Sequence, residues 1–417
     1  MSSTPRVPVG EAVSRILTSV SALPPEDAAL HEALGRVLCT DIVARHTHPA
    51  WRNSAMDGYA VHGDDVRGAS VDAPVTLPVG GTIAAGDQPP TSVPRGAAWR
   101  IMTGAPLPDG VDTVIRVEDT DAGEARVQVR ADRDVQRNIR PRGEDFSAGD
   151  PLVARGTVLR APHIGLAAAC GHASVPVVRR PRVAIIGSGN ELVDVDRFDE
   201  VLAGRRIINT NGHVLAAAVR EAGGIPVNLG IAPDDPAAIA ARILEAPPFD
   251  VLITCGGISV GAFDYTRDVV KRLGATLDFW RVRMRPGGPF GYGMLGHRPW
   301  FGLPGNPVSA MVTHELFVRP ALLRMGGHDA AVRAPVEVTL AEPVSTQGSL
   351  THFLRAVVSP DRRCTLTGPQ GSGMLTSMAA ANALLIVPHD VTYLAAGAAA
   401  HAILLHDNSQ MAVTWTY

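Results

Sequence analysis

The pattern of apolar and polar positions changes along the chain and predicts separate folding units. Apolar side chains recur near the helical period in residues 9–17, 30–38 and 164–170. Between the second and third of these segments, short alternating runs are separated by Gly, Pro and Asp, which is typical of β-strands and turns. We therefore expect a helical N-terminal and linking domain, residues 1–48 and 150–180, interrupted by a β-rich inserted domain, residues 49–149.

From Arg182 to about Gly327, apolar runs with strand character alternate with amphipathic segments of helical length. Strands alternating with helices indicate a mostly parallel, doubly wound sheet, and ligands bind such sheets at the carboxyl ends of the strands. We expect a central three-layer α/β domain over residues 181–328. Short alternating strands after Arg333 predict a small C-terminal β-barrel over residues 329–417.

Composition narrows the classes of function. The 417 residues exceed a single domain of roughly 100–200 residues. A formal net charge of −3, without a long basic run, argues against a nucleic-acid partner. No apolar stretch reaches the ~18 residues of a spanning helix, so we expect no membrane association. Four scattered cysteines without a C-x-x-C pair indicate neither a disulfide framework nor a structural zinc site, and the cytoplasm is the expected compartment.

Lys271 is the single lysine of the chain, and it lies in a segment with helical periodicity. A P-loop needs lysine after its glycines, and Schiff-base catalysis needs a lysine amine, so both chemistries are disfavoured. Anion binding must therefore rely on arginine, backbone N–H groups and helix ends.

The loop Cys255-Gly256-Gly257-Ile258-Ser259-Val260-Gly261 is the strongest chemical signal in the sequence. It follows the apolar run of residues 249–254 and leads to Asp264, at the start of a predicted helix. A buried strand that breaks into paired glycines and a hydroxyl can present backbone N–H groups to phosphate. We interpret this loop as an anion site.

Acidic loops follow other predicted strands of the same domain. Glu191 lies in the loop of residues 187–191, and Asp234 and Asp235 follow the strand that ends at Gly230. Together with Asp264, these carboxylates would meet at one edge of the sheet, and carboxylates beside a phosphate site suit Mg²⁺. The simpler alternative is that Asp235 and Asp264 only cap helices.

Arginines at alternate positions 281, 283 and 285 would share one face of an extended strand and could bind oxyanions. The turn Pro304-Gly305-Asn306-Pro307 would aim the N-terminus of a helix over residues 307–323 at the same region. A solvated arginine edge and an ordinary tight turn remain the alternative. Loops around Asp57 and Thr103 look like surface turns on composition alone, and the histidines are not spaced as metal ligands.

Five motifs, in this order, closely resemble the MoeA family, the molybdopterin molybdenumtransferases, and a similar domain occurs in gephyrin. They are Asn53-Ser-Ala-Met-Asp-Gly-Tyr-Ala, Met102-Thr-Gly-Ala-Pro, Pro181-Arg-Val-Ala-Ile, Gly256-Gly-Ile-Ser-Val-Gly with Asp264-Tyr265, and Leu303-Pro-Gly-Asn-Pro-Val-Ser. The resemblance implies an elongated homodimer of four-domain subunits. It also implies cleavage of adenylylated molybdopterin and insertion of molybdate at the dithiolene with a divalent cation such as Mg²⁺, which releases AMP and molybdenum cofactor.

The resemblance also implies site residues, and it places the family's cleft between the α/β domain of one subunit and the β insertion of the other. It implies catalytic roles for Asp57, Thr103, Glu191 and Asp264, and metal binding by Glu191, Asp235 and Asp264. Substrate binding would fall to Gly256, Gly257, Ser259, Arg281, Arg285, Pro304, Gly305, Asn306, Ser309, Arg355 and Ser372. Partners implied are a second copy of the chain, with a molybdopterin adenylyltransferase and molybdoenzymes or cofactor carriers as further possibilities.

Three positions depart from the family pattern. Asn190 stands where a carboxylate is common, which would weaken metal binding, and Gly288 stands where a lysine is common. Cys255 replaces a serine before the glycines, either as a small buried residue or as a thiol near molybdenum. Two alternatives to an insertase remain: a catalytically weak molybdopterin-binding or scaffold protein, and a molybdopterin adenylyltransferase, which would not need the β insertion or the barrel.

Overall fold

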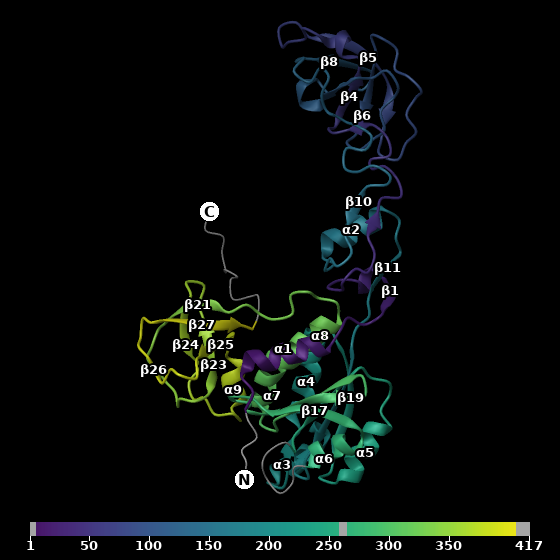
Figure 1. Cartoon of the computed structure of the whole chain (residues 1–417). Coiled ribbons are helices and arrows are strands. Elements are labelled where there is room, and N and C mark those ends of the chain that lie inside the picture. Colours follow the sequence, from purple (N-terminus) through teal and green to yellow (C-terminus); the bar gives the residue numbers. More distant parts are fainter. Residues whose placement is uncertain (1–5, 258–264, 406–417) are drawn as a thin grey trace. The chain divides into compact units, whose positions relative to one another are not determined.

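The structure is a computed structural model of the chain, and it describes residues 6–257 and 265–405. Contacts within the chain separate two compact units. The first comprises residues 1–39, 156–160 and 176–417, and the second comprises residues 40–155 and 161–175 (Figure 1). The finer division into four domains stays a prediction.

The N-terminal helices are only partly as expected. Helix α1 (Val9–Ser19) forms, as does α2 (Ala161–Ala169). The helix predicted over residues 30–38 is wrong: β1 (Pro25–Ala29) leads into one short 3-10 turn, η1 (Leu30–Glu32). Gly35 has a φ of +76°, and Val37 and Leu38 then pair as extended chain with Val158 and Val177. Pairing with distant segments overrides the local helical periodicity.

The main sheet of the first unit has six strands. Their order is β15 (Ile225–Ala232), β12 (Arg182–Ser188), β16 (Val251–Cys255), β20 (Arg298–Leu303), β19 (Pro289–Leu295) and β17 (Ala275–Arg281). The four strands from β15 to β20 are parallel, whereas β19 is antiparallel to both of its neighbours. The predicted, mostly parallel sheet therefore carries an antiparallel edge.

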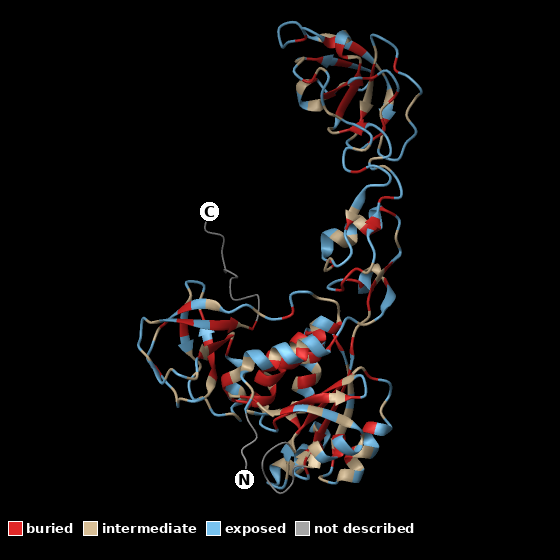
Figure 2. Cartoon of the chain, in the orientation of Figure 1, coloured by how far each residue is buried: buried red, intermediate tan, exposed pale blue. Residues whose placement is uncertain are grey.

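Helices pack on both faces of this sheet, and strand β12 shows why. Val183 and Ile185 belong to one core cluster with Leu215 of α4 (Thr210–Glu221). Ala184 and Ile186 belong to another, with side chains of α5 (Pro236–Leu244) and α6 (Tyr265–Arg272). A strand covered on both faces must be apolar at successive positions, which explains its unbroken apolar run. Figure 2 shows these strands as buried.

The helical segment after residue 306 contains a π-helical turn. It consists of α7 (Pro307–Thr313), the π-turn η5 (His314–Val318) and α8 (Arg319–Met325), where a single helix over residues 307–323 is predicted. Pro320 has no backbone N–H, so the α-helical bond to the carbonyl of Leu316 cannot form. A wider turn just before the proline accommodates this missing bond.

The C-terminal region contains a closed five-stranded barrel, which agrees with the predicted barrel. Each strand pairs with the next in the order β23 (Thr351–Val358), β24 (Arg363–Leu366), β21 (Val336–Leu340), β27 (Ala399–Leu404) and β25 (Ala383–Val387), and β25 pairs again with β23. Phe353 and Leu384 share a core cluster with the central sheet, so the barrel packs on the α/β part of its unit.

The second unit is β-rich, as expected for the insertion. Its main sheet has the order β7 (Thr113–Arg116), β4 (Gly58–Val61), β6 (Ala98–Ile101), β5 (Val75–Ile83) and β8 (Arg126–Val129). Tyr59 and Ile115 are completely buried in its core. No helix among residues 6–257 and 265–405 has the length and apolar character needed to cross a membrane.

The remaining elements are short. They are β2 (Ile42–Val43), β3 (Asn53–Ser54), β9 (Ile139–Arg140), β10 (Pro151–Val153), β11 (Ser174–Val178), β13 (Leu192–Val193), α3 (Phe198–Leu202), β14 (Ile207–Ile208), β18 (Met284–Arg285), β22 (Val344–Ser345), α9 (Leu375–Ala379) and β26 (Tyr393–Leu394), together with the 3-10 turns η2 (Gly63–Val66), η3 (Val117–Asp119) and η4 (Val195–Arg197).

Candidate functional site

A cavity of about 480 Å³ lies at the carboxyl ends of the parallel strands of the first unit, and we call it the strand-end pocket. The loops after β12, β15, β16 and β20 line it, which is the expected place for a ligand in a sheet of this kind. Its residues include Ser188, Glu191, Asn209, Asn211, Asp234, Cys255, Gly256, Gly257, Pro304, Gly305 and Asn306.

Gly256 and Gly257 have backbone conformations that require glycine. Their φ angles are +96° and +63°, and a Cβ on Gly256 would lie 2.7 Å from the carbonyl oxygen of Ser188. The N–H of Gly256 donates to the carbonyl of Leu303 at 3.1 Å. The N–H of Gly256 is therefore already bonded, and of the two described glycines Gly257 keeps its N–H as a candidate donor to an anion, while residues 258–261 of the predicted loop lie outside the described residues.

Cys255 is a buried structural residue in the floor of the strand-end pocket. Its Sγ lies 3.2 Å from the carbonyl oxygen of Pro304 and donates to it. Burial raises the pKa of the Cys255 thiol to about 12, so the group stays protonated at neutral pH. A protonated, hydrogen-bonded thiol is a poor metal ligand, which favours the interpretation of Cys255 as a small buried residue over that of a thiol near molybdenum.

Two carboxylates face the strand-end pocket, those of Glu191 and Asp234. Asp234 Oδ2 accepts a hydrogen bond from the N–H of Asn190 at 3.1 Å, and Asn190 Oδ1 accepts from the N–H of Asp234 at 3.2 Å. The neutral side chain at position 190 therefore ties two pocket loops together.

Of the other two predicted metal ligands, Asp235 lies elsewhere and Asp264 is not described. Asp235 does not line the pocket: it is the N-cap of α5 and accepts from the N–H groups of Ala237 and Ala238. Asp264 and Ser259 lie outside the described residues. Within residues 6–257 and 265–405, no three His, Cys, Asp or Glu side chains cluster as a metal site would require. Glu191 and Asp234 still suit Mg²⁺, because this ion keeps several waters and takes one or two protein carboxylates.

The turn of Pro304, Gly305 and Asn306 is fixed from two sides. Asn211 of α4 donates through Nδ2 to the carbonyl of Gly305 at 2.6 Å. Asn306 donates to Ser372 Oγ at 3.1 Å, and the N–H of Val308 donates to the Ser372 carbonyl. Ser372, a predicted substrate-binding residue that follows barrel strand β24, is thus joined to the turn. One of the first N–H groups of α7 is already bonded and is not free for an anion.

A second cavity of about 610 Å³ adjoins the first, since Pro289 and Asn306 line both, and we call it the arginine pocket. Arg6, Arg281 and Arg285 line it, and among residues 6–257 and 265–405 no acidic side chain does. Ser309, Gln370, Gly371 and Ser372 supply polar groups. Excess positive charge in a cavity favours an oxyanion, and the guanidinium group binds oxyanions bidentately.

The arginines do not share one strand face as predicted. Strand β17 ends at Arg281, and Met284 and Arg285 begin β18, which pairs with the barrel strand β23. Arg283 does not line the arginine pocket. The change of partner strand between residues 281 and 284 breaks the alternation, so two of the three arginines meet in the cavity.

Arg355 is completely buried and holds a loop in place. Its guanidinium donates to the carbonyls of Pro369, Gln370 and Gly371 and to Ser377 Oγ. Burial lowers the pKa of Arg355. The loop that it holds leads to Ser372 and lines the arginine pocket. The predicted direct contact of Arg355 with substrate does not fit this placement, and positioning of the loop does.

In the second unit, Asp57 and Thr103 contact each other. Asp57 Oδ1 accepts from the Thr103 N–H at 2.7 Å and from Thr103 Oγ1 at 2.8 Å. These bonds, that of the backbone N–H first, lower the pKa of Asp57, so its carboxylate is ionised at neutral pH. Two loops that composition alone assigns to surface turns therefore form one polar cluster.

Sequence reasoning missed Arg6, Asn211 and Gln370. The N–H of Val7 donates to the carbonyl of Arg281 at 2.9 Å, and this contact brings Arg6 beside the arginine pocket. Gln370 bonds the backbone of Arg355 on both sides. No local sequence pattern predicts Arg6 or Gln370 as a site residue, because each reaches the site through hydrogen bonds with a distant segment of the chain.

Comparisons with known proteins agree with this geometry. Family models of the MoeA N-terminal region (domain I and II), of a probable molybdopterin binding domain and of the MoeA C-terminal region (domain IV) match residues 7–171, 184–324 and 337–405. Molybdopterin molybdenumtransferase 2 of Mycobacterium tuberculosis is 38% identical over 89% of this chain and 93% of that protein. The chain belongs to the MoeA family.

Further relatives extend the match over the whole chain. The molybdopterin molybdenumtransferase of Bacillus subtilis is 34% identical over 98% of this chain and 96% of that protein. The crystal structure of the molybdopterin biosynthesis MoeA protein of Pyrococcus horikoshii superposes with a TM-score of 0.78. It is 29% identical and covers 96% of this chain and 100% of that one. The predicted family is therefore confirmed, and the chain has a MoeA-like fold.

Proposed function

We propose that this MoeA-family enzyme is a molybdenum insertase, which cleaves adenylylated molybdopterin and inserts molybdate into its dithiolene. The curated relatives carry the name molybdopterin molybdenumtransferase, a transferase of molybdenum cofactor biosynthesis. The observation that carries the finer proposal is the pair of adjoining cavities, one with two carboxylates and one with three arginines. A cation site beside an oxyanion site suits a pyrophosphate substrate and molybdate.

The carboxylates of Glu191 and Asp234 would hold Mg²⁺ in the strand-end pocket. When bound, the cation neutralises charge on the pyrophosphate oxygens that it contacts. The reciprocal bonds between Asn190 and Asp234 fix the second carboxylate, so the neutral residue at position 190 serves as a positioning group. The Gly257 N–H would donate to a phosphate oxygen.

The arginine pocket would bind the second oxyanion, either a phosphate of the substrate or molybdate. Arg6, Arg281 and Arg285 would neutralise it, and Ser309 and Ser372 lie in the same cavity as hydroxyl donors. Hydrolysis, in which a water oxygen forms a bond to the phosphorus next to the pterin and AMP leaves, needs charge neutralisation and orientation more than a protein nucleophile. This fits a site in which the one cysteine is buried and protonated.

The proposal includes a homodimer in which the Asp57–Thr103 cluster of one chain completes the cleft of the other. The ionised Asp57 carboxylate would then supply a proton acceptor or orient a water. Because the substrate arrives adenylylated and the product is a cofactor, a molybdopterin adenylyltransferase and molybdoenzymes or cofactor carriers are the expected transient partners, and the cytoplasm the expected site of action.

The decisive experiment incubates the purified protein with adenylylated molybdopterin, Mg²⁺ and molybdate, and follows AMP release and formation of molybdenum cofactor. We expect turnover that EDTA abolishes. Arg281→Gln should reduce it at least tenfold, since one charge-assisted contact contributes about 1.5–3 kcal/mol. Tight binding of the pterin nucleotide without AMP release would instead favour the scaffold alternative.

A further inference from the structure

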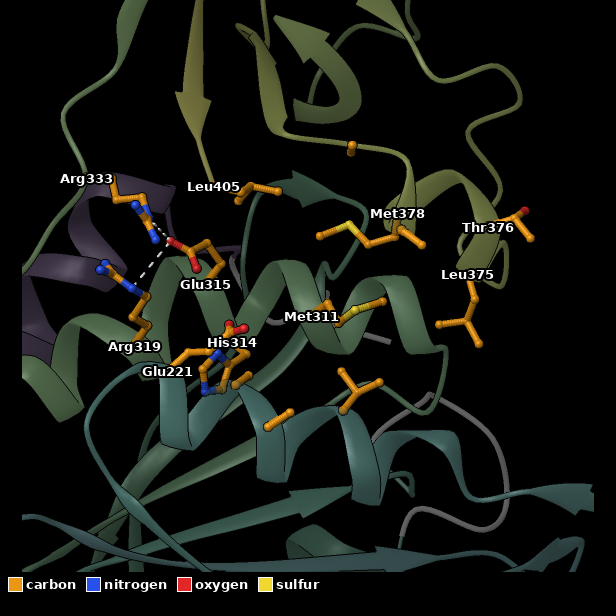
Figure 3. A pocket seen from close by; sticks show the side chains of 15 residues that line it. Glu221, Met311, His314, Glu315, Arg319, Arg333, Leu375, Thr376, Met378 and Leu405 are labelled. Carbon is orange, nitrogen blue, oxygen red and sulfur yellow. Dashed lines mark hydrogen bonds and ion pairs between the residues drawn. The ribbon is translucent and has the colours of Figure 1, made fainter. Parts of the chain in front are cut away.

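A third cavity, of about 540 Å³, lies away from the candidate site and shares no lining residue with the strand-end or arginine pocket. It is bounded by α4, by α7 with its π-turn, by α9 and by Leu405 at the end of the barrel. Figure 3 shows Met311 and Met378 on opposite sides of it. We call it the helix pocket. Its size is that of cavities that hold small organic molecules.

The wall of the helix pocket is mainly apolar. Val214, Met311, Leu375, Met378 and Leu405 line it, together with several alanines. Alanines at the contact of helices leave empty volume that longer side chains would fill, and methionine adapts its shape to what it contacts. An apolar molecule is therefore favoured over a highly charged one.

One buried polar atom in this wall has no hydrogen-bond partner in the part of the chain that the structure describes. His314 is 3% exposed, and its Nε2 makes no hydrogen bond. Burial, with the nearby charge of Arg319, lowers the pKa of His314 to about 3, so the ring is neutral at neutral pH. A buried unsatisfied nitrogen costs about 1–3 kcal/mol, which a ligand with a hydrogen-bonding group would recover. His314 also begins the π-turn, a feature frequent at functional sites.

Four charged side chains line the helix pocket, those of Glu221, Glu315, Arg319 and Arg333, and their formal charges sum to zero. Three of them contact each other. Glu315 Oε1 lies 2.7 Å from Arg333 Nε and 3.9 Å from Arg319 Nε, at one end of the cavity (Figure 3). Because these charges compensate, they do not call for an ionic ligand. We propose that the helix pocket binds an uncharged, mostly apolar small molecule whose single hydroxyl or carbonyl group pairs with His314.

The test uses the full-length protein with ¹³C-methyl methionine and two probes of equal shape, 4-propylphenol and propylbenzene. Both should shift the Met311 and Met378 methyl signals. The phenol should bind about threefold to tenfold more tightly, because one hydrogen bond contributes about 0.5–1.5 kcal/mol. In His314→Leu, a folded variant without the polar atom, the two probes should bind equally.

Ala218→Phe fills the cavity from α4 and should weaken both probes more than tenfold. The matched control is Ala237→Phe, since Ala237 is an exposed alanine on α5 away from the pocket. Absence of methyl shifts, or equal loss in both variants, would overturn the proposal. So would binding that appears only when residues 406–417 are removed, because that segment of the chain would then be the occupant.

Discussion

At Gly256 a single missing methyl group permits the approach of two strand ends. The Cα of this residue sits where a Cβ would be 2.7 Å from the Ser188 carbonyl oxygen, and its φ is +96°. The neighbouring Gly257 would place a Cβ 2.5 Å from Thr266 Oγ1. The paired glycines of the sequence therefore serve close packing of loops at least as much as anion binding.

Gly256→Ala should destabilise the protein by about 2–4 kcal/mol, since it adds a contact with backbone to the cost of a left-handed conformation. Gly274→Ala is the matched control: its φ is +91° and a Cβ there meets nothing within 4 Å. It should cost only about 1 kcal/mol. Urea unfolding measures both, and equal losses would show that conformation alone requires glycine at position 256.

The sequence predicts which residues lie near the two cavities better than it predicts what each residue does there. Glu191, Arg281, Arg285, Asn306 and Ser372 all line the two cavities, as the sequence predicts. Asp235 has a carboxylate and Arg355 a guanidinium group, as a metal ligand and an anion-binding residue would need. In the structure, Asp235 caps a helix and Arg355 donates to loop carbonyls. Composition cannot separate these uses, because the hydrogen-bond partners are set by the tertiary structure.

At the scale of the elements, an ion pair between Arg116 and the buried Asp134 holds the end of strand β7 in the second unit. Asp134 is completely buried and accepts from Arg116 Nε at 2.8 Å and Nη2 at 2.7 Å. Arg116 ends β7, so this pair joins the strand to the segment of residues 132–138. Burial opposes ionisation of Asp134, but the bonds from Arg116 outweigh it and lower the pKa below the ordinary value.

Asp134→Asn should therefore destabilise the second unit by about 1.5–3 kcal/mol at pH 7, because Arg116 loses its charge-assisted hydrogen bonds and keeps a 3.7 Å contact with Asp119. A carboxylate whose pKa is lowered on folding stabilises the protein above its unfolded pKa of ~3.9. That stabilisation is lost as the pH falls through the folded value, so the gap between variant and parent should narrow below about pH 4.

Amide hydrogen exchange in β7 and residues 132–138 measures the difference. The control is Asp64→Asn, in an ion pair with Arg67 whose side chains are 66% and 60% exposed. It should change exchange little at either pH. A gap for Asp134→Asn that stays constant between pH 7 and pH 3 would contradict the assigned ionisation.

The two predicted helices that failed did so for different reasons, one tertiary and one local. Residues 30–38 have helical periodicity, yet Val37 and Leu38 pair with chain more than a hundred residues away. The π-turn at His314 is explained by Pro320, which is visible in the sequence, but the apolar periodicity around it predicts one continuous helix. The parallel strands were predictable because burial on both faces leaves an unbroken apolar run in the sequence.

For the whole molecule, the residues of the proposed function are divided between the two units. The two cavities and their arginines lie in the first unit, and the Asp57–Thr103 cluster lies in the second. The eight-residue motif around Asp57, residues 53–60, contributes no lining residue to either cavity. If that cluster acts in catalysis, it must approach the cleft either from its own chain or from a second copy.

Mixing two inactive variants decides between these arrangements. Asp57→Asn and Arg281→Gln should each lose AMP release when alone. If cleft and cluster come from different chains of a dimer, each mixed dimer has one intact site and one doubly altered site. Random reassociation makes about half of the dimers mixed, so activity should return to about a quarter of the parent value. If both parts come from one chain, every site in the mixture carries one substitution and activity stays absent. The parent enzyme taken through the same reassociation shows whether the procedure itself preserves activity, and sedimentation confirms that mixed dimers have formed.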